Sequence, residues 1–131
     1  MARIKKACII DDDHIFLFGA KRMMESTSFC DVLLVYRNGR EALEALKGMV
    51  DENEELPSVI FLDINMPVLD GWQFLEEFEE ILNDQVIHIF ILSSSIDPQD
   101  LKKAELFSSI REFIHKPIKY SDLARVKECI D

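Results

Sequence analysis

The stretch "CIIDDDHIF", residues 8–16, places three adjacent carboxylates directly after an apolar run. Like charges this close repel one another unless a positive group lies among them. One helix start needs one capping side chain, and Asp13 stands directly before the helical pattern "HIFLF", so it is the natural N-cap. Asp11 and Asp12 remain available for another role, and a bound cation would remove their repulsion.

Other chemically useful groups also follow apolar runs. Asp63 ends "SVIFLD", the serines 93–95 follow "VIHIFIL", and Lys116 follows "IREFIH" and precedes Pro117. Asp70 stands at the next helix start and takes the capping role there, which leaves Asp63 without that explanation. The chain therefore offers carboxylates, a hydroxyl and an ammonium at the ends of apolar segments.

This set of groups favours phosphoryl chemistry. Carboxylates, a backbone carbonyl and waters form an oxygen-only site, which suits a hard cation such as Mg²⁺. The ammonium of Lys116 is a mobile point charge suited to a phosphate oxygen, and a serine hydroxyl can donate to another. Asp63 is the natural nucleophile for a group stabilised in this way.

The elements that must position these groups alternate along the chain. Apolar, β-branched runs predict strands, and amphipathic stretches between them predict helices. The expected strands are 7–11, 32–36, 58–63, 86–92 and 110–116. Strict alternation implies an α/β fold in which a five-stranded parallel sheet has helices on both faces. Function is then expected at the carboxyl ends of the strands.

Two helix starts carry their own signals. Asp97 precedes Pro98, which predicts an N-cap followed by proline at the first helical position. Ser121 is expected to cap the last helix, "DLARVKECI".

Composition limits the class of protein. The 131 residues, 48% of them hydrophobic, are expected to form one domain over 1–131. The net charge of −10 disfavours direct nucleic-acid binding. The early apolar run is too short for a signal peptide, and no stretch reaches the length of a membrane span. Cys8, Cys30 and Cys129 show no metal-binding spacing and are expected to be small core residues in a reducing cytosol.

Four motifs in this order and spacing, "IIDD", "FLDINMPVLDGW", "ILSSS" and "HKP", resemble the receiver domain of bacterial two-component response regulators. The resemblance runs from Ile4 to Ile130 and is to the stand-alone, chemotaxis-receiver-like type. It implies a flavodoxin-like (βα)5 fold with strand order 2-1-3-4-5 and helices on both faces.

The resemblance also implies a metal and a phospho-acceptor. Asp63 matches the phospho-acceptor and, with Asp12, a direct Mg²⁺ ligand. Asn65 matches the residue that offers its backbone carbonyl to the metal, and Asp11 matches an acidic partner that acts through water.

Ser93 matches the hydroxyl that contacts the phosphoryl group, although Ser94 remains an alternative one residue away. Ser95 falls where the family places a residue that tunes dephosphorylation. Lys116 matches the family lysine, and the bond from Lys116 to Pro117 is a candidate cis peptide.

Family behaviour suggests the partners. A sensor histidine kinase or a histidine phosphotransfer protein would donate the phosphoryl group in the cytoplasm. Ser93 and Phe113 would form the switch. Output would run through protein contacts of the fourth helix, fifth strand and fifth helix, and slow self-dephosphorylation would reset the state. The chain would catalyse only its own phosphorylation and dephosphorylation. The family's usual Gly-Ala pair before the fifth strand is replaced by "LFSSIREF", which leaves the fourth helix and its output surface open.

The sequence leaves three alternative functions to compare with this one. A Mg²⁺-dependent aspartyl-phosphate phosphohydrolase would need a second carboxylate where Asn65 stands. A flavodoxin-like cofactor binder would need a phosphate loop, which the four glycines do not form. A degenerate receiver that acts only as a binding module would lack a key residue, yet each matched position is filled.

Overall fold

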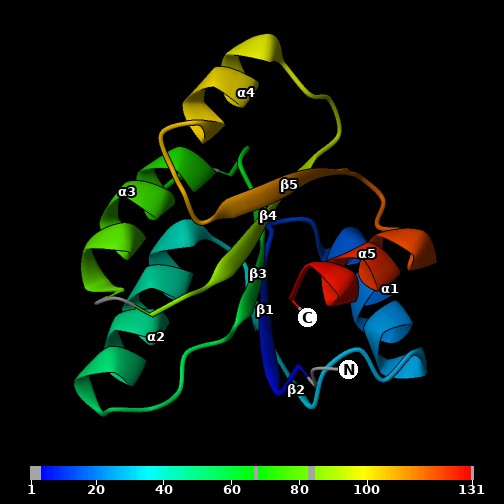
Figure 1. Ribbon diagram of the computed structural model, residues 1–131, viewed down its shortest axis with the longest axis horizontal. Coiled ribbons are helices and arrows are strands. Elements are labelled where there is room, and N and C mark those ends of the chain that lie inside the picture. Colours follow the sequence, from blue (N-terminus) through cyan, green and yellow to red (C-terminus); the bar gives the residue numbers. More distant parts are fainter. Residues whose placement is uncertain (1–3, 67, 83–84, 131) are drawn as a thin grey trace.

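The computed structural model describes residues 4–66, 68–82 and 85–130. Strands and helices alternate along the chain, as Figure 1 shows. The strands are β1 (Lys6–Ile10), β2 (Val32–Tyr36), β3 (Val59–Asp63), β4 (His88–Ser93) and β5 (Ile110–His115). The helices are α1 (His14–Ser26), α2 (Gly39–Asp51), α3 (Gly71–Ile81), α4 (Pro98–Ala104) and α5 (Tyr120–Ile130).

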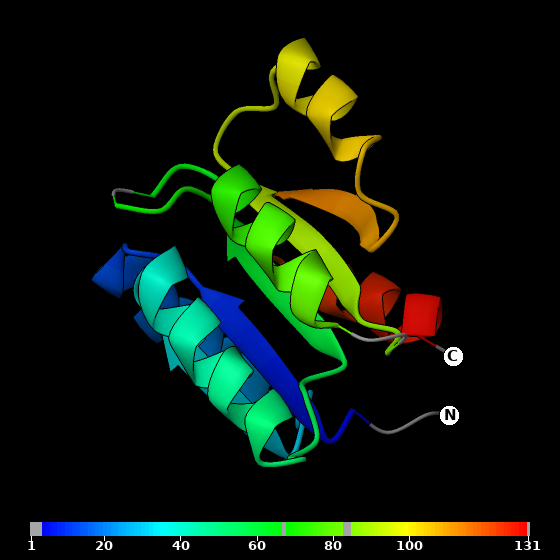
Figure 2. The same cartoon turned by 90° about the vertical axis from the view of Figure 1, so that its left-hand side faces the viewer.

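The strands form one parallel sheet in the order β2-β1-β3-β4-β5, which confirms the predicted topology. Helices α1 and α5 cover one face, and α2 and α3 cover the other (Figures 1 and 2). Because every strand runs in the same direction, all five carboxyl ends meet at one edge of the sheet.

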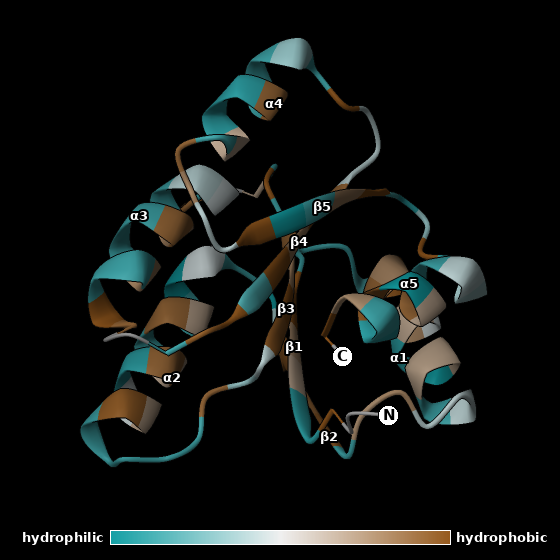
Figure 3. Cartoon of the chain, in the orientation of Figure 1, coloured by the Kyte–Doolittle hydropathy of each residue, from teal (hydrophilic) through white to brown (hydrophobic). Residues whose placement is uncertain are grey.

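Side chains of successive strand residues enter two different cores, one on each face of the sheet. On β3, Phe61 joins the core under α1 and α5, and Leu62 joins the core under α2 and α3. All five residues of β3 are buried. The inner strands are accordingly mostly hydrophobic in Figure 3, while the helices show both hydrophilic and hydrophobic segments.

The caps of the first four helices follow side-chain chemistry. Asp13 accepts hydrogen bonds from the N–H groups of Ile15 and Phe16, and Asp97 accepts one from Gln99 with Pro98 as the first helical residue. Both caps were predicted from the sequence and are confirmed. Asn38 caps α2, and Asp70 forms a capping box with Gln73 at α3.

The expected cap at Ser121 is wrong. Helix α5 begins at Tyr120, two residues before the expected start at Asp122, so Ser121 lies inside its first turn. The carboxylate of Asp122 instead accepts the N–H of Lys119 at 2.8 Å, which ties the helix start from inside the first turn.

The expectation that all three cysteines are core residues is correct only for Cys8. Cys8 is buried in β1 as expected, but Cys30 is only half-buried and Cys129 is exposed on α5. An exposed thiol near a helix end does not contribute to the core.

Helix α4 is short and lies outside both cores. None of its seven residues, all of which the structure describes, is buried. Its C-terminal flank is tied to α3, because Phe107 stacks on Trp72 with centroids 6.0 Å apart, and the ammonium of Lys103 lies 5.9 Å from the Trp72 ring. Within the described ranges, no helix is long and apolar enough to cross a membrane.

One loop residue carries backbone strain. Val68, between β3 and α3, adopts a φ of 74°, which is unfavourable for a β-branched residue, and its side chain is 81% exposed. We expect Val68→Asn to raise the free energy of unfolding by about 1 kcal/mol, because asparagine tolerates this conformation. Chemical denaturation of the two proteins measures the change. Val86→Asn is the matched control, since Val86 is 70% exposed in the loop before β4 and its φ is not positive. Equal effects of the two substitutions would contradict the strain.

Candidate phosphoryl-transfer and metal site

The carboxyl edge of the sheet brings together the acids and the lysine predicted from the sequence. Asp11 follows β1, Asp63 ends β3 and Lys116 follows β5. Counting by two from residues in the core under α1 and α5, all three fall on that face of the sheet. The strand alternation thus directs three distant residues toward one point.

Lys116 connects the two buried acids. Its ammonium lies 2.6 Å from Oδ2 of Asp11 and 3.5 Å from Oδ2 of Asp63. Asp11 is completely buried, Asp63 is 4% exposed, and the Lys116 side chain is 18% exposed. A buried carboxylate needs such a partner, because burial without one is strongly unfavourable.

The backbone around Asp63 is held from two sides. The N–H of Asn65 donates to Oδ1 of Asp63 at 2.9 Å, which orients the carboxylate. Gly71 approaches so closely that a Cβ there would lie 2.7 Å from Cα of Ile64. A Cβ on Gly39 would lie 2.7 Å from the carbonyl of Leu69. The two glycines let α3 and α2 pack directly against the loop that follows Asp63.

Burial dominates the electrostatics of the two acids. It raises the pKa of Asp63 to about 6, helped by the charge of Asp11 and opposed by the Asn65 N–H. Burial also raises the pKa of Asp11, against the hydrogen bond from Lys116. For Lys116, burial acts to lower the pKa, but the hydrogen bond and charge of Asp11 outweigh it and raise the pKa.

The acids suit a divalent cation. One carboxylate oxygen each from Asp11, Asp12 and Asp63 lie within 4.8 Å of one another. When all three are ionised, Lys116 leaves two net negative charges. Among the described residues, the ammonium of Lys116 at 2.6 Å is the only partner of the buried Oδ2 of Asp11. Oxygen ligands and excess negative charge suit Mg²⁺, which proteins bind through one or two carboxylates while the ion keeps several waters.

The structure distinguishes the serines that follow β4. Ser93 is the last strand residue and is buried, whereas Ser94 and Ser95 are exposed. The hydroxyl of Ser93 donates to the carbonyl of Ser95, and the N–H of Lys116 donates to the carbonyl of Ser93 at 2.8 Å. Ser93 is therefore linked to Lys116 through the backbone, which favours Ser93 over Ser94 as the hydroxyl of this site.

Phe113 and Pro117 lie where the sequence places them, on β5 and after it. The peptide bond from Lys116 to Pro117 is cis, as predicted. Phe113 is half-buried against the core under α2 and α3, the face opposite to Lys116. Ser93 and Phe113 share this face on neighbouring strands, because Ile91 pairs with Phe113 and Ser93 is two residues further along.

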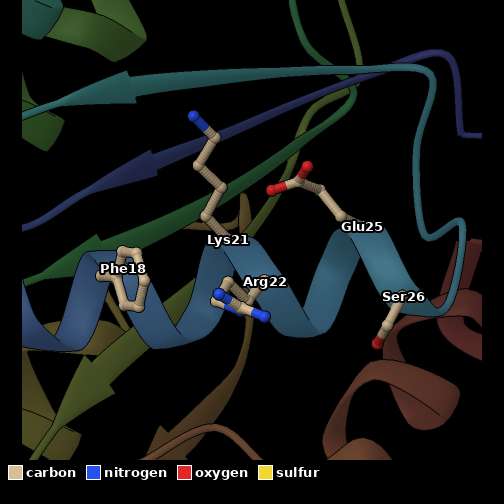
Figure 4. Close-up of a pocket in the computed structure, with 5 residues that line it drawn as sticks. All are labelled: Phe18, Lys21, Arg22, Glu25 and Ser26. Atoms are coloured by element: carbon tan, nitrogen blue, oxygen red, sulfur yellow. The ribbon is translucent and has the colours of Figure 1, made fainter.

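Sequence reasoning missed Phe16. The ring of this half-buried residue in the first turn of α1 has its centroid 4.6 Å from the ammonium of Lys116. The available signal was its position three residues after the Asp13 cap, since side chains in a first turn lean back toward the preceding strand end. A depression on α1, shown in Figure 4 and lined by Phe18, Lys21, Arg22, Glu25 and Ser26, shares none of the site residues.

Comparison with known proteins places these features in a family. The family model for the response regulator receiver domain matches residues 7–127. A probable methanogenesis regulatory protein FilR2 of Methanothrix harundinacea is 24% identical over 92% of this chain and 77% of its own length. The chain spans only about a third of the length of the protein-glutamate methylesterases that it also matches.

Solved structures show the same architecture. A two-component response regulator from Cytophaga hutchinsonii has a TM-score of 0.88 and 27% identity, with 98% of each chain covered. The receiver domain of the histidine kinase CKI1 from Arabidopsis thaliana, solved in complex with Mg²⁺, has a TM-score of 0.86. It is 19% identical, with 97% of this chain and 92% of that chain covered, so this likeness concerns the fold.

The buried Asp63 predicts a pH-dependent stability in metal-free buffer. Its pKa of about 6 lies above the ordinary value of 3.8, so the folded state binds more protons between these pH values. The free energy of unfolding therefore falls as pH rises through this window. We expect Asp63→Asn to stabilise the protein at pH 8 by roughly 3 kcal/mol, and by about half as much at pH 5.

Urea denaturation in EDTA at both pH values measures the effect. Asp51→Asn, at the exposed end of α2, is the control and should change stability little at either pH. A gain for Asp63→Asn that is the same at pH 5 and pH 8 would contradict the raised pKa.

Proposed function

The chain belongs to the response regulator receiver domain family of two-component systems, and we propose that it accepts a phosphoryl group on Asp63 in a Mg²⁺-dependent reaction. The donor would be a sensor histidine kinase or a histidine phosphotransfer protein, the partners with which receiver domains work. The modified protein would signal through contacts with a downstream protein.

The observation that carries this proposal is the shared ammonium at the sheet edge. Lys116 reaches both Asp11 and Asp63, and Asp63 is the buried acid whose loop is fixed by Asn65 and by two close glycines. A carboxylate that acts as a nucleophile must be held in a fixed position, and the entering phosphoryl oxygens need a cation that is already in place.

The proposed step is a direct displacement. A carboxylate oxygen of Asp63 attacks the phosphorus, the P–N bond of the donor phosphohistidine breaks, and the imidazole leaves with that electron pair. Asp63 must be ionised to attack, and with its pKa at about 6 it is largely ionised above pH 7. Lys116, 3.5 Å from Oδ2, would turn to pair with a phosphoryl oxygen.

Asp12, Asp63 and the backbone carbonyl of Asn65 would hold the Mg²⁺ ion, with Asp11 acting through water. When bound, the ion would neutralise charge that develops on the phosphoryl oxygens. Asp12 is exposed and Asp11 is buried, which supports the assignment of Asp12 as the direct ligand and Asp11 as the deeper partner.

The proposed readout begins at Ser93. Its hydroxyl now donates to the carbonyl of Ser95, and a phosphoryl oxygen on Asp63 would compete for that proton. Movement of Ser93 would free space for Phe113, which lies on the same face of the sheet. The surface altered would be that of α4, β5 and α5, where Leu101 and Leu106 are exposed on and after α4. Ser95 is proposed to tune the reset.

We propose that the chain catalyses only its own phosphorylation and slow dephosphorylation. We also propose that it is located in the cytoplasm. A phosphohydrolase would need a general acid two residues after the nucleophile, where Asn65 has an amide side chain. Turnover of small phosphomonoesters over many cycles would favour that alternative and would count against the receiver function.

Incubation with acetyl phosphate and Mg²⁺ tests the proposal. We expect the intact mass to rise by one phosphoryl group in the wild type and to stay unchanged in Asp63→Asn, because no other residue receives the group. Lys116→Ala should lower the rate roughly a hundredfold, through loss of a cation at the transferring group.

A control variant and a second measurement accompany this experiment. Asp51→Asn should be phosphorylated like the wild type, because it lies at the exposed end of α2. Beryllofluoride should change the fluorescence of Trp72, which lies one residue after Gly71 and stacks on Phe107. A mass gain that persists in Asp63→Asn would exclude Asp63 as the acceptor.

A further inference from the structure

We infer that Phe16 is a positioning residue for Lys116: its ring holds the ammonium over Asp11 and Asp63 and shields it from water. This inference rests on the proposed phosphoryl transfer and adds one residue to it. Phe16 does not touch the reacting atoms and acts through Lys116.

The geometry around the ammonium supports this role. Asp11 lies at 2.6 Å and Asp63 at 3.5 Å, and the Phe16 ring centroid lies at 4.6 Å. A cation within about 6 Å of an aromatic centroid is attracted to the ring face. Lys116 therefore has an aromatic neighbour in addition to its two acids.

An aromatic ring suits this place for an electrostatic reason. A carboxylate at residue 16 would cancel the positive charge that a phosphoryl oxygen needs. The phenyl ring attracts the ammonium through its quadrupole and leaves that charge intact. The ring also limits exposure of the lysine, whose flexible stem and strong hydration otherwise favour solvent.

Phe16 is itself fixed. Its N–H donates to the Asp13 carboxylate at 3.2 Å, so the cap of α1 sets its backbone position. Its side chain is half-buried and packs beside the core under α1 and α5. The ring also lines a cavity with neighbours on α1 and with Pro117 and Ile118. A fixed ring can restrain a mobile lysine.

The same helix provides a matched control. Phe18 also has a cation on its ring, because Cζ of Arg22 lies 5.5 Å from its centroid, but its side chain is 63% exposed and lies two residues along from Phe16. Figure 4 shows Phe18 and Arg22 on α1. Phe18→Leu removes an equivalent interaction without touching Lys116.

Rates of phosphorylation by acetyl phosphate with saturating Mg²⁺ provide the first readout. We expect Phe16→Leu to lower the rate roughly three- to tenfold, the range that a partly shielded cation–π contact supports. Phe16→Tyr, which keeps the ring, should retain the wild-type rate. Phe18→Leu should also leave the rate unchanged. In the Lys116→Ala background, Phe16→Leu should have no further effect, because its partner is absent.

Proton NMR of the Lys116 side chain provides a readout independent of activity. Protons on Cε should show an upfield ring-current shift in the wild type, in Phe16→Tyr and in Phe18→Leu, and should lose it in Phe16→Leu. A wild type that accepts no phosphoryl group would refute the proposed function, while the ring-current shift would still decide whether Phe16 holds Lys116.

Three results would overturn the inference. The first is a Phe16→Leu protein with an unchanged rate and an unchanged Lys116 shift. The second is a slow Phe16→Tyr protein whose Tm equals that of the wild type. The third is an equal loss of rate from Phe16→Leu with and without Lys116.

Discussion

Two buried carboxylates share one ammonium at the carboxyl edge of the sheet. The surrounding structure holds these two acids and one lysine together. Asp11 follows β1 and Asp63 ends β3, two adjacent strands, while Lys116 follows β5, the outermost strand on that side of the sheet. Neither acid could remain buried and charged without a partner. The neighbouring strands β1, β3, β4 and β5 must therefore all be paired before the site exists. Its excess negative charge makes a cation the natural further component.

The strand alternation separates the chemistry from the proposed readout. Asp11, Asp63 and Lys116 follow the face covered by α1 and α5, whereas Ser93 and Phe113 follow the face covered by α2 and α3. Asp63, Ser93 and Lys116 all lie at the carboxyl ends of their strands, where residues of the two sets are neighbours. The backbone link at this point is the 2.8 Å hydrogen bond from Lys116 N–H to the Ser93 carbonyl. This bond joins the backbones of Lys116 and Ser93 within the sheet, at the point where the proposed event begins.

Much of the architecture could be predicted because it depends on local patterns. Apolar runs set the strands, and the cap at Asp13 and the end of β3 at Asp63 were evident from neighbouring residues. Features set by tertiary contacts could not be predicted. Asp122 moved the start of α5 away from Ser121, and the Phe16 ring met Lys116 only after residues a hundred apart packed together. The metal and acceptor roles of the acids remain predictions that the geometry supports.

The short α4 suggests why a local charge event could reach a distant surface. Most elements are anchored by buried side chains, but α4 buries none of its described residues. Its tie to α3 consists of the Phe107–Trp72 stack and the nearby Lys103. Elements with few buried contacts open or shift at low free-energy cost. Trp72 follows Gly71, and Gly71 packs on the backbone of Asp63 and Ile64, so a change at Asp63, the proposed acceptor, bears directly on the contact that holds α4.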